Sequence, residues 1–193
     1  MKIILVGASG QIGKEVDKLL SVEHEIVRVG ARSGDIQCDY TSPDSVNSMF
    51  QQIKKFDHLI CVAGRDSTFK PFETLSEDDY QHGFERKFLG QLRLVNLGLE
   101  HIAENGSFTL TSGYLNYYPN SSSIGTGPLN SMVDTWVANV APMLPKGIRL
   151  NCVSPAPVVE PGKEGKGLVT AEYTAQFYSD AVRGDMTGRV LLP

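Results

Sequence analysis

The sequence has few of the features that mark disulfide-rich scaffolds, metal proteins and nucleic-acid binders. Its three cysteines, Cys38, Cys61 and Cys152, show no Cys-x-x-Cys spacing, which argues against a disulfide framework and a zinc ribbon. The four histidines are not paired at a ligand spacing, so no metal site is expected. Basic residues are not in excess: 18 Lys and Arg face 22 Asp and Glu, and a net charge of -4 argues against a nucleic-acid partner.

Long apolar runs are also absent. The first run, residues 3–6, is far shorter than the ~18 residues that a membrane span needs, and it lacks the features of a signal peptide. We therefore expect reduced cysteines, a cytoplasmic location and no membrane partner. With 193 residues, 41% of them hydrophobic and 21% charged, the chain has ordinary globular composition, and residues 1–193 are predicted to form one domain.

Short β-rich apolar runs alternate with segments of helical spacing. Strands that are apolar almost throughout are typical of a parallel sheet covered by helices on both faces. The pattern predicts an α/β fold with a doubly wound parallel sheet. The predicted strands are 3–6, 25–29, 58–62, 107–110, 148–153 and 189–192.

Two helices carry clear start signals. One follows Ser42, which precedes a proline and an acidic residue, and the other follows Ser76, which precedes three acidic residues. The second helix is predicted to be long, with apolar spacing that reaches Leu99. The stretches 114–126 and 155–167 fit no regular element and directly follow predicted strands, so they are the predicted loops of a ligand site.

A glycine-rich turn, Gly7-Ala8-Ser9-Gly10-Gln11-Ile12-Gly13, follows the first strand and opens a helix. Glycine allows the sharp turn and the close approach to a pyrophosphate, which the N–H groups of the helix then bind. The turn predicts dinucleotide binding by Gly7, Ser9, Gly10, Gln11, Ile12 and Gly13; the alternative is a tight turn with no ligand. No Walker-type Gly-Lys-Ser/Thr and no Gly-x-Ser-x-Gly are present, which argues against a nucleotide triphosphatase and a serine hydrolase.

The residues about 20 positions beyond this turn bear on the choice of cofactor. An acidic residue there binds the ribose 2′-OH of NAD, whereas an arginine accepts the 2′-phosphate of NADP. Arg32 and Ser33 follow the second predicted strand and favour NADP(H) over NAD(H), because a guanidinium presents a planar fork of donors. In the alternative, Arg32 is a solvated loop cation and Asp35 binds the ribose.

Further segments, in chain order, resemble the short-chain dehydrogenase/reductase family. They are Cys38-Asp39-Tyr40-Thr41, Val62-Ala63-Gly64, Thr111-Ser112-Gly113, the stretch 147–155 and the stretch 187–191. The resemblance implies a Rossmann fold of about seven strands in the order 3-2-1-4-5-6-7. It implies hydride transfer between a nicotinamide and a small carbonyl or alcohol substrate, in a homodimer or homotetramer. The cofactor contacts that it adds are Asp39, Tyr40, Ala63, Gly64 and Pro155.

The family's catalytic pattern is only partly present. Ser112 stands where the family has a serine that polarises the substrate oxygen, but Tyr-x-x-x-Lys occurs nowhere in the chain. Counting back from residues 147–149 places the expected tyrosine near Ser123 and the lysine near Gly127, within a few residues. The family's helical asparagine aligns near Lys87.

Three hypotheses follow from this departure. In the first, the chain is an NADP(H)-dependent oxidoreductase in which Ser112 orients the oxygen and either Tyr114, perturbed by Lys87, or an ordered water supplies the proton. In the second, it is a catalytically silent NADP-binding sensor or scaffold, in which Tyr114 shields the crevice and Lys87 is an ordinary helix residue. In the third, it is a structural module without a cofactor. The apolar helix face around Trp136 fits either a subunit interface or packing against the sheet.

Overall fold

The computed structural model describes residues 1–64, 69–121 and 124–193, and it is built on a seven-stranded parallel sheet. In the order of the sheet, the strands are β3 (Ile36–Gln37), β2 (Glu25–Gly30), β1 (Lys2–Val6), β4 (Phe56–Cys61), β5 (Ile102–Thr111), β6 (Arg149–Val153) and β9 (Val190–Leu191). This order confirms the predicted doubly wound Rossmann sheet. Its last strand is the ninth along the chain because β7 (Val158–Val159) and β8 (Val169–Thr170) pair in a separate two-stranded sheet.

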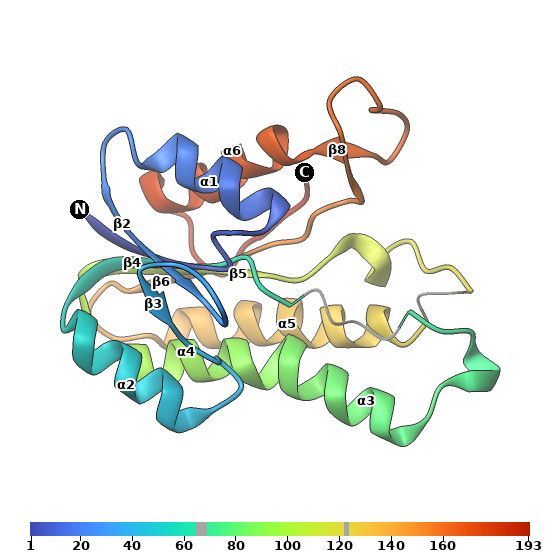
Figure 1. Ribbon diagram of the computed structural model, residues 1–193, viewed down its shortest axis with the longest axis horizontal. Coiled ribbons are helices and arrows are strands. Elements are labelled where there is room, and N and C mark those ends of the chain that lie inside the picture. Colours follow the sequence, from blue (N-terminus) through green and yellow to red (C-terminus); the bar gives the residue numbers. More distant parts are fainter. Residues whose placement is uncertain (65–68, 122–123) are drawn as a thin grey trace.

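Helices cover both faces of the sheet (Figure 1). On one face lie α1 (Gln11–Leu20) and α6 (Ala171–Arg183), and on the other lie α2 (Pro43–Ile53), α4 (Gly90–Gly98) and α5 (Thr126–Val140), which continues into the 3-10 turn η4 (Ala141–Met143). Each face has its own apolar core. The central strands are therefore buried on both sides, which explains their unbroken apolar runs.

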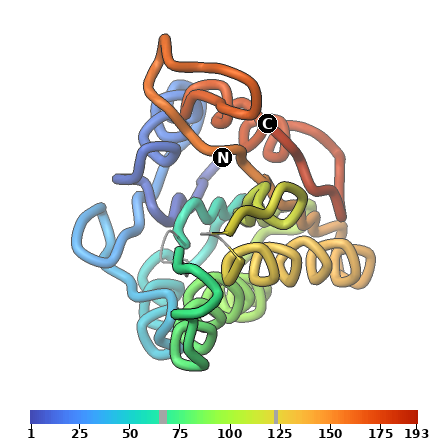
Figure 2. Tube along the Cα trace, turned by 90° about the vertical axis from the view of Figure 1, so that its right-hand side faces the viewer, coloured from blue at the N-terminus to red at the C-terminus, as the bar shows by residue number. Residues whose placement is uncertain are grey.

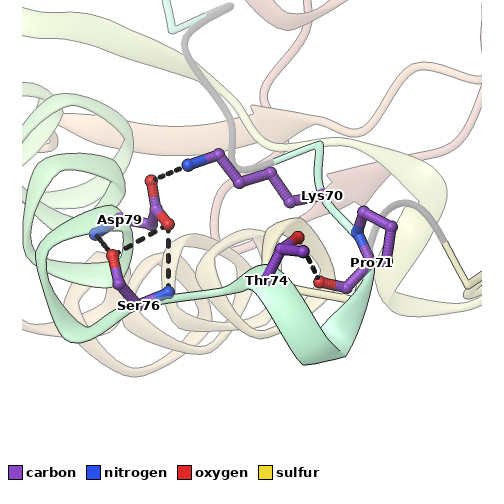
Figure 3. A network of polar contacts seen from close by, with 5 residues as sticks. All are labelled: Lys70, Pro71, Thr74, Ser76 and Asp79. Carbon is purple, nitrogen blue, oxygen red and sulfur yellow. Dashed lines mark hydrogen bonds and ion pairs between the residues drawn. The ribbon is translucent and has the colours of Figure 1, made fainter.

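The predicted long helix consists of three segments. These are α3 (Glu77–Gly83), a π-helical turn η2 (Phe84–Leu89) and α4. Figure 3 shows how it starts, after the 3-10 turn η1 (Phe72–Thr74): the Asp79 N–H donates to Ser76 Oγ (3.2 Å), and the Ser76 N–H donates to Asp79 Oδ2 (3.0 Å). Lys70 Nζ donates to Asp79 Oδ1 (2.6 Å), and these contacts lower the pKa of Asp79 to about 2. The cap fixes the segment that enters the helix.

The two predicted site loops both contain short elements and contact each other. The first holds the 3-10 turn η3 (Tyr114–Asn116), and the second holds β7 and leads into β8. The N–H of Tyr114 donates to the carbonyl of Pro155 (3.1 Å), so the loops that follow β5 and β6 are hydrogen-bonded. Figure 2 shows the orange segment around β7 and β8 projecting from the body of the protein.

The described residues include neither a membrane-spanning helix nor a cluster of metal ligands. No helix among them is long and apolar enough to cross a membrane. In the same part of the chain, no three His, Cys, Asp or Glu side chains form a group that could hold a metal ion. All three cysteines are buried and free.

Candidate functional site

The glycine-rich turn between β1 and α1 has a backbone that requires glycine. Gly7 adopts a φ of 89°, and its N–H donates to the Val29 carbonyl (2.8 Å). A Cβ on Gly13 would collide with the Gly7 carbonyl oxygen, so glycine permits α1 to pack closely against the turn. No side chain caps α1 at Gly10, which leaves the first N–H groups of the helix available to an anion.

This turn forms one wall of a cavity of about 520 Å³ at the carboxyl end of the sheet, which we call the turn cleft. The other walls come from the end of β4, from Lys87 and Thr111, and from Pro157 and Val158. Gly64 has a φ of 118°, and a Cβ there would lie 3.3 Å from Lys87 Cδ, so the backbone passes close to this lysine. The predicted cofactor residues that line the cleft are Gly10, Gln11, Ile12, Gly13, Ala63 and Gly64.

Other predicted cofactor residues lie outside the lining of the turn cleft. Gly7 and Ser9 belong to the turn itself, and Arg32 and Ser33 are exposed in the segment after β2. Asp35, the alternative ribose ligand, is already bound: its Oδ2 accepts from the Arg28 N–H (2.8 Å) and lies 3.6 Å from the Arg28 guanidinium.

The two predicted adenine-side contacts follow β3. The Asp39 carboxylate accepts from the Thr41 hydroxyl (2.7 Å) and N–H (3.0 Å), and these bonds lower the pKa of Asp39. The ring of Tyr40 packs against Gly90 so closely that a Cβ on this glycine would collide with it. Asp39 and Tyr40 are thus held by local contacts at the same edge of the sheet as the turn cleft.

A second cavity, of about 390 Å³, adjoins the turn cleft, and we call it the serine cavity. The two share Gly64, Phe69, Lys87 and Pro157 as lining residues. All three predicted catalytic residues, Ser112, Tyr114 and Lys87, line the serine cavity, together with the predicted contact Pro155. Ser112 is 4% exposed, and its Oγ has no hydrogen-bond partner among the described residues. A buried hydroxyl without a partner is suited to bind a ligand oxygen.

Lys87 is buried where the turn cleft meets the serine cavity. Its side chain is 5% exposed, and Nζ donates to the Ser112 carbonyl (2.6 Å). Burial lowers the pKa of the Lys87 ammonium. Burial also raises the pKa of the nearby thiols, that of Cys61 to about 11 and that of Cys152 further, so these thiols are neutral near pH 7. No hydrogen bond joins Lys87 to Tyr114 in the part of the chain that the structure describes.

Gln91, which the sequence interpretation missed, holds the π-helical turn that carries Lys87. Its amide nitrogen donates to the carbonyls of Lys87 (2.7 Å) and Thr111 (2.9 Å), and its Oε1 accepts from the Thr111 N–H (2.9 Å). A π-helical turn frees backbone groups that need partners, and such turns are frequent at functional sites. Gln91 thereby ties Lys87 to the end of β5, one residue before Ser112.

Thr126 and Asn130 were also missed. They lie four residues apart on α5, which is the spacing of Tyr-x-x-x-Lys, and both line the serine cavity with Ser112. Each is three residues beyond the position obtained by counting; Ser123 lies outside the described residues, and a Cβ on Gly127 would face the Leu115 carbonyl at 3.0 Å. Thr126 Oγ1 and Asn130 Oδ1 are buried without partners among the described residues. Neither side chain carries an ionisable proton donor.

One helical turn further along α5, Asp134 binds the η3 loop. Its Oδ2 accepts from Asn116 Nδ2 (2.6 Å) and from the Tyr117 hydroxyl (3.0 Å). Burial and the nearby carboxylate of Asp134 raise the pKa of Tyr117, so this phenol remains a donor near pH 7. The contacts hold the loop that presents Tyr114 to the serine cavity.

The chain is similar to several known proteins. A family model described as "Enoyl-(Acyl carrier protein) reductase" matches residues 8–187. The hydroxynaphthalene reductase-like protein Arp2 of Metarhizium brunneum is 31% identical over 94 residues, which cover 47% of this chain and 35% of that protein. The matched segment thus spans about a third of the length of this relative. An uncharacterized oxidoreductase of Methylorubrum extorquens is 26% identical over 208 residues, covering 94% of this chain and 82% of that protein.

Solved structures show the same fold. The protein lin1944 of Listeria innocua is 34% identical, with a TM-score of 0.93, and the match covers 100% of this chain and 98% of that one. A small-chain dehydrogenase solved in complex with NADPH is 24% identical with a TM-score of 0.89, covering 100% of this chain and 96% of that one, and it supports the fold. Since the family model spans nearly the whole chain and the sheet has the family's strand order, the protein belongs to the short-chain dehydrogenase/reductase family.

Proposed function

We propose that the chain is an NADP(H)-dependent oxidoreductase that reduces a small carbonyl compound or oxidises the corresponding alcohol. The observation that carries this proposal is the junction of the two cavities: the turn cleft meets the serine cavity at Lys87, beside the unpartnered hydroxyl of Ser112. A dinucleotide held by the residues of the turn cleft would lie beside the serine cavity, because the two cavities share lining residues. NADP(H), when bound, supplies or accepts the hydride.

The residues of the serine cavity have separate parts in this reaction. Ser112 Oγ donates a hydrogen bond to the substrate oxygen, which polarises the carbonyl. The buried ammonium of Lys87 stabilises negative charge that develops on this oxygen, and the lowered pKa of Lys87 favours release of a proton. In carbonyl reduction, Tyr114, or a water molecule held by Thr126 and Asn130, whose buried oxygens have no partner among the described residues, donates one proton to the substrate oxygen, and Lys87 then returns a proton to this donor.

The preference for NADP(H) over NAD(H) rests on the segment after β2. Asp35 is held by Arg28, whereas Arg32 is exposed and has no ion pair among the described residues. The guanidinium of Arg32, with the Ser33 hydroxyl, is therefore available to a 2′-phosphate. The NADPH complex of the small-chain dehydrogenase supports this choice. The adjoining contacts Asp39, Tyr40 and Pro155 are assigned to the same cofactor.

We further propose a single domain over residues 1–193, a cytoplasmic location and a homodimer or homotetramer. Several similar proteins are named as reductases or dehydrogenases of small molecules, among them the hydroxynaphthalene reductase-like protein.

An alternative function is a catalytically silent NADP-binding sensor or scaffold. It is favoured by the absence of Tyr-x-x-x-Lys, since Thr126 and Asn130 occupy that spacing on α5.

Titration with NADPH and NADH, followed by fluorescence, tests the cofactor site. We expect Arg32→Ala to weaken NADPH binding by about tenfold or more and to leave NADH binding unchanged, because charge-assisted hydrogen bonds are each worth roughly 1.5–3 kcal/mol. Gly10→Trp should abolish both, and Arg183→Ala, which changes an exposed arginine on α6, is the control. Equal losses for both cofactors in Arg32→Ala would contradict the 2′-phosphate assignment.

Oxidation of NADPH with a panel of aldehydes and ketones tests the reaction. The oxidoreductase proposal predicts substrate-dependent oxidation that falls at least tenfold in Ser112→Ala, since removing a polarising donor costs about this much or more. Tyr114→Phe should lower the rate if the phenol is the acid and leave it unchanged if water is. Saturable NADPH binding with no oxidation by any member of the panel would instead support the silent sensor.

A further inference from the structure

A third cavity, of about 630 Å³, lies on the other side of the η3 loop, and we call it the tyrosine cavity. Three tyrosines, Tyr114, Tyr117 and Tyr118, line it. Tyr114 and Ala156 line the serine cavity as well, so the two cavities adjoin. Its volume lies within the range of small-molecule sites, about 300–1,000 Å³.

The lining of the tyrosine cavity leaves apolar surface uncovered. Tyr118 is 70% exposed, Leu192 is 55% exposed, Tyr117 is 46% exposed and Leu168 is 37% exposed. Single exposed apolar side chains are common on proteins, but a group of them around one concave site marks a binding surface. These four side chains come from the η3 region, from the segment before β8 and from the segment after β9.

The aromatic wall of this cavity is held in place before any ligand binds. The rings of Tyr114 and Tyr118 are 5.7 Å apart and tilted by 34°. The Tyr117 hydroxyl is bound to Asp134 Oδ2, and the Tyr114 N–H is bound to the Pro155 carbonyl. Rigid aromatic walls lose little conformational entropy on binding, and they favour flat rings that pack face to face or edge to face.

Ser154 adds a polar group to this apolar lining. It is completely buried, lines the tyrosine cavity, and its Oγ has no hydrogen-bond partner among the described residues. A buried hydroxyl without a partner costs free energy, so a ligand oxygen that forms a hydrogen bond with it is favoured. The exposed Lys166 also lines the cavity and suits an electron-rich ring.

We propose that the tyrosine cavity binds the aromatic body of the substrate whose carbonyl group lies in the serine cavity. The substrate class is then an aryl ketone or aldehyde with an oxygen substituent on the ring that reaches Ser154. The Tyr114 and Ala156 boundary between the cavities lets one molecule extend into both. The assignment of this ligand as a substrate rests on the proposed function, whereas the binding of the aromatic ring does not.

Binding of 1-tetralone and of its saturated counterpart 1-decalone, measured by calorimetry on the full chain, tests the aromatic preference. We expect 1-tetralone to bind at least fivefold more tightly. Tyr118→Leu, which keeps an apolar side chain but removes the ring, should weaken 1-tetralone binding by about two- to tenfold. The control Tyr173→Leu removes an exposed tyrosine of α6 that does not line this cavity, and it should change neither affinity.

Two further variants test the volume and the polar contact. Leu168→Trp fills the cavity from an exposed position and should abolish 1-tetralone binding while leaving NADPH binding unchanged. 6-Hydroxy-1-tetralone should bind more tightly than 1-tetralone, and Ser154→Ala should remove this difference without changing the affinity for 1-tetralone.

The outcomes separate this inference from the proposed function. Equal affinities for 1-tetralone and 1-decalone, or 1-tetralone binding that persists in Leu168→Trp, would overturn the aromatic site even if small aldehydes are reduced by NADPH. Conversely, 1-tetralone binding that depends on Tyr118 and Leu168, with no NADPH oxidation by any ketone, would support the aromatic site and overturn the oxidoreductase.

Discussion

His58 in β4 illustrates how burial sets the charge of a single residue and, through it, the pH dependence of folding. It is 4% exposed, and its Nδ1 lies 2.8 Å from Ser107 Oγ. Burial, with a smaller effect from Arg149, lowers the pKa of His58 to about 4. Above the unfolded pKa of about 6.5 the residue is neutral in both states. Below it, the unfolded chain binds a proton that the folded chain does not, so stability falls from about pH 6.5 to pH 4.

Urea denaturation at pH 7 and pH 4.5 measures this effect. We expect His58 to contribute a loss of up to about 3 kcal/mol over that range. His58→Gln should show a smaller decrease than the wild type, whereas His82→Gln, an exposed residue of α3, should behave like the wild type. If the pH dependence is the same in His58→Gln as in the wild type, the assignment is wrong.

Single residues differ in how far the sequence reveals them. Gly7 and Gly13 could be predicted from the sequence. Gly7 has a positive φ that favours glycine, and a Cβ on Gly13 would collide with the turn, so both positions after the first strand require glycine. Ser112 and Lys87 were found through the family's pattern. Thr126 and Asn130 could not be recognised, because a threonine and an asparagine on a helix carry no signal until the fold places them beside Ser112.

Among the elements, the π-helical turn η2 depends on one buried side chain from the following helix. Gln91 makes three hydrogen bonds, to backbone groups of Lys87 and Thr111, and is completely buried. Gln91→Leu would remove all three of these buried hydrogen bonds. We expect it to destabilise the protein by about 3 kcal/mol and to speed hydrogen exchange at the Thr111 amide. Chemical denaturation and native-state exchange measure both effects.

The matched control for this change is Gln81→Leu, at an exposed position of α3. It should leave stability within about 0.5 kcal/mol of the wild type. Unchanged protection of the Thr111 amide in Gln91→Leu would show that the turn does not depend on this side chain.

The sequence predicted elements that show a regular spacing of apolar residues. It did not predict short elements that are held by specific hydrogen bonds. Six strands of the central sheet and the long helix after Ser76 follow from spacing and capping, whereas β3, which has only two residues, was not among the predicted strands. The π-helical turn within that helix depends on contacts of Gln91 across to β5, which spacing does not encode. Likewise β7 and β8 are two residues each, and they pair in parallel across a loop, which apolar spacing does not encode.

For the molecule as a whole, the outer face of α5 bears on assembly. Phe88, Met132 and Trp136 form an apolar groove there, with the exposed Thr135 between them. We expect sedimentation to show a dimer or tetramer. Thr135→Arg should shift it toward monomer without lowering thermal stability, because this side chain does not enter the core, and Asn47→Arg on α2 is the control. An unchanged sedimentation coefficient in Thr135→Arg would exclude this face as the interface.

The position of Lys87 limits the order of substitutions that could convert this site into one with the family's Tyr-x-x-x-Lys motif. Thr126→Tyr and Asn130→Lys would restore Tyr-x-x-x-Lys on α5, yet Asn130 and Lys87 line the same small cavity. Two ammonium groups buried there would repel each other, so Asn130→Lys is expected to be tolerated only after Lys87 has been replaced by a neutral residue. The effects of substitutions at Asn130 and Lys87 are therefore expected to be epistatic. Any path of single substitutions between the two arrangements would then pass through a variant with no buried cation in the cavity.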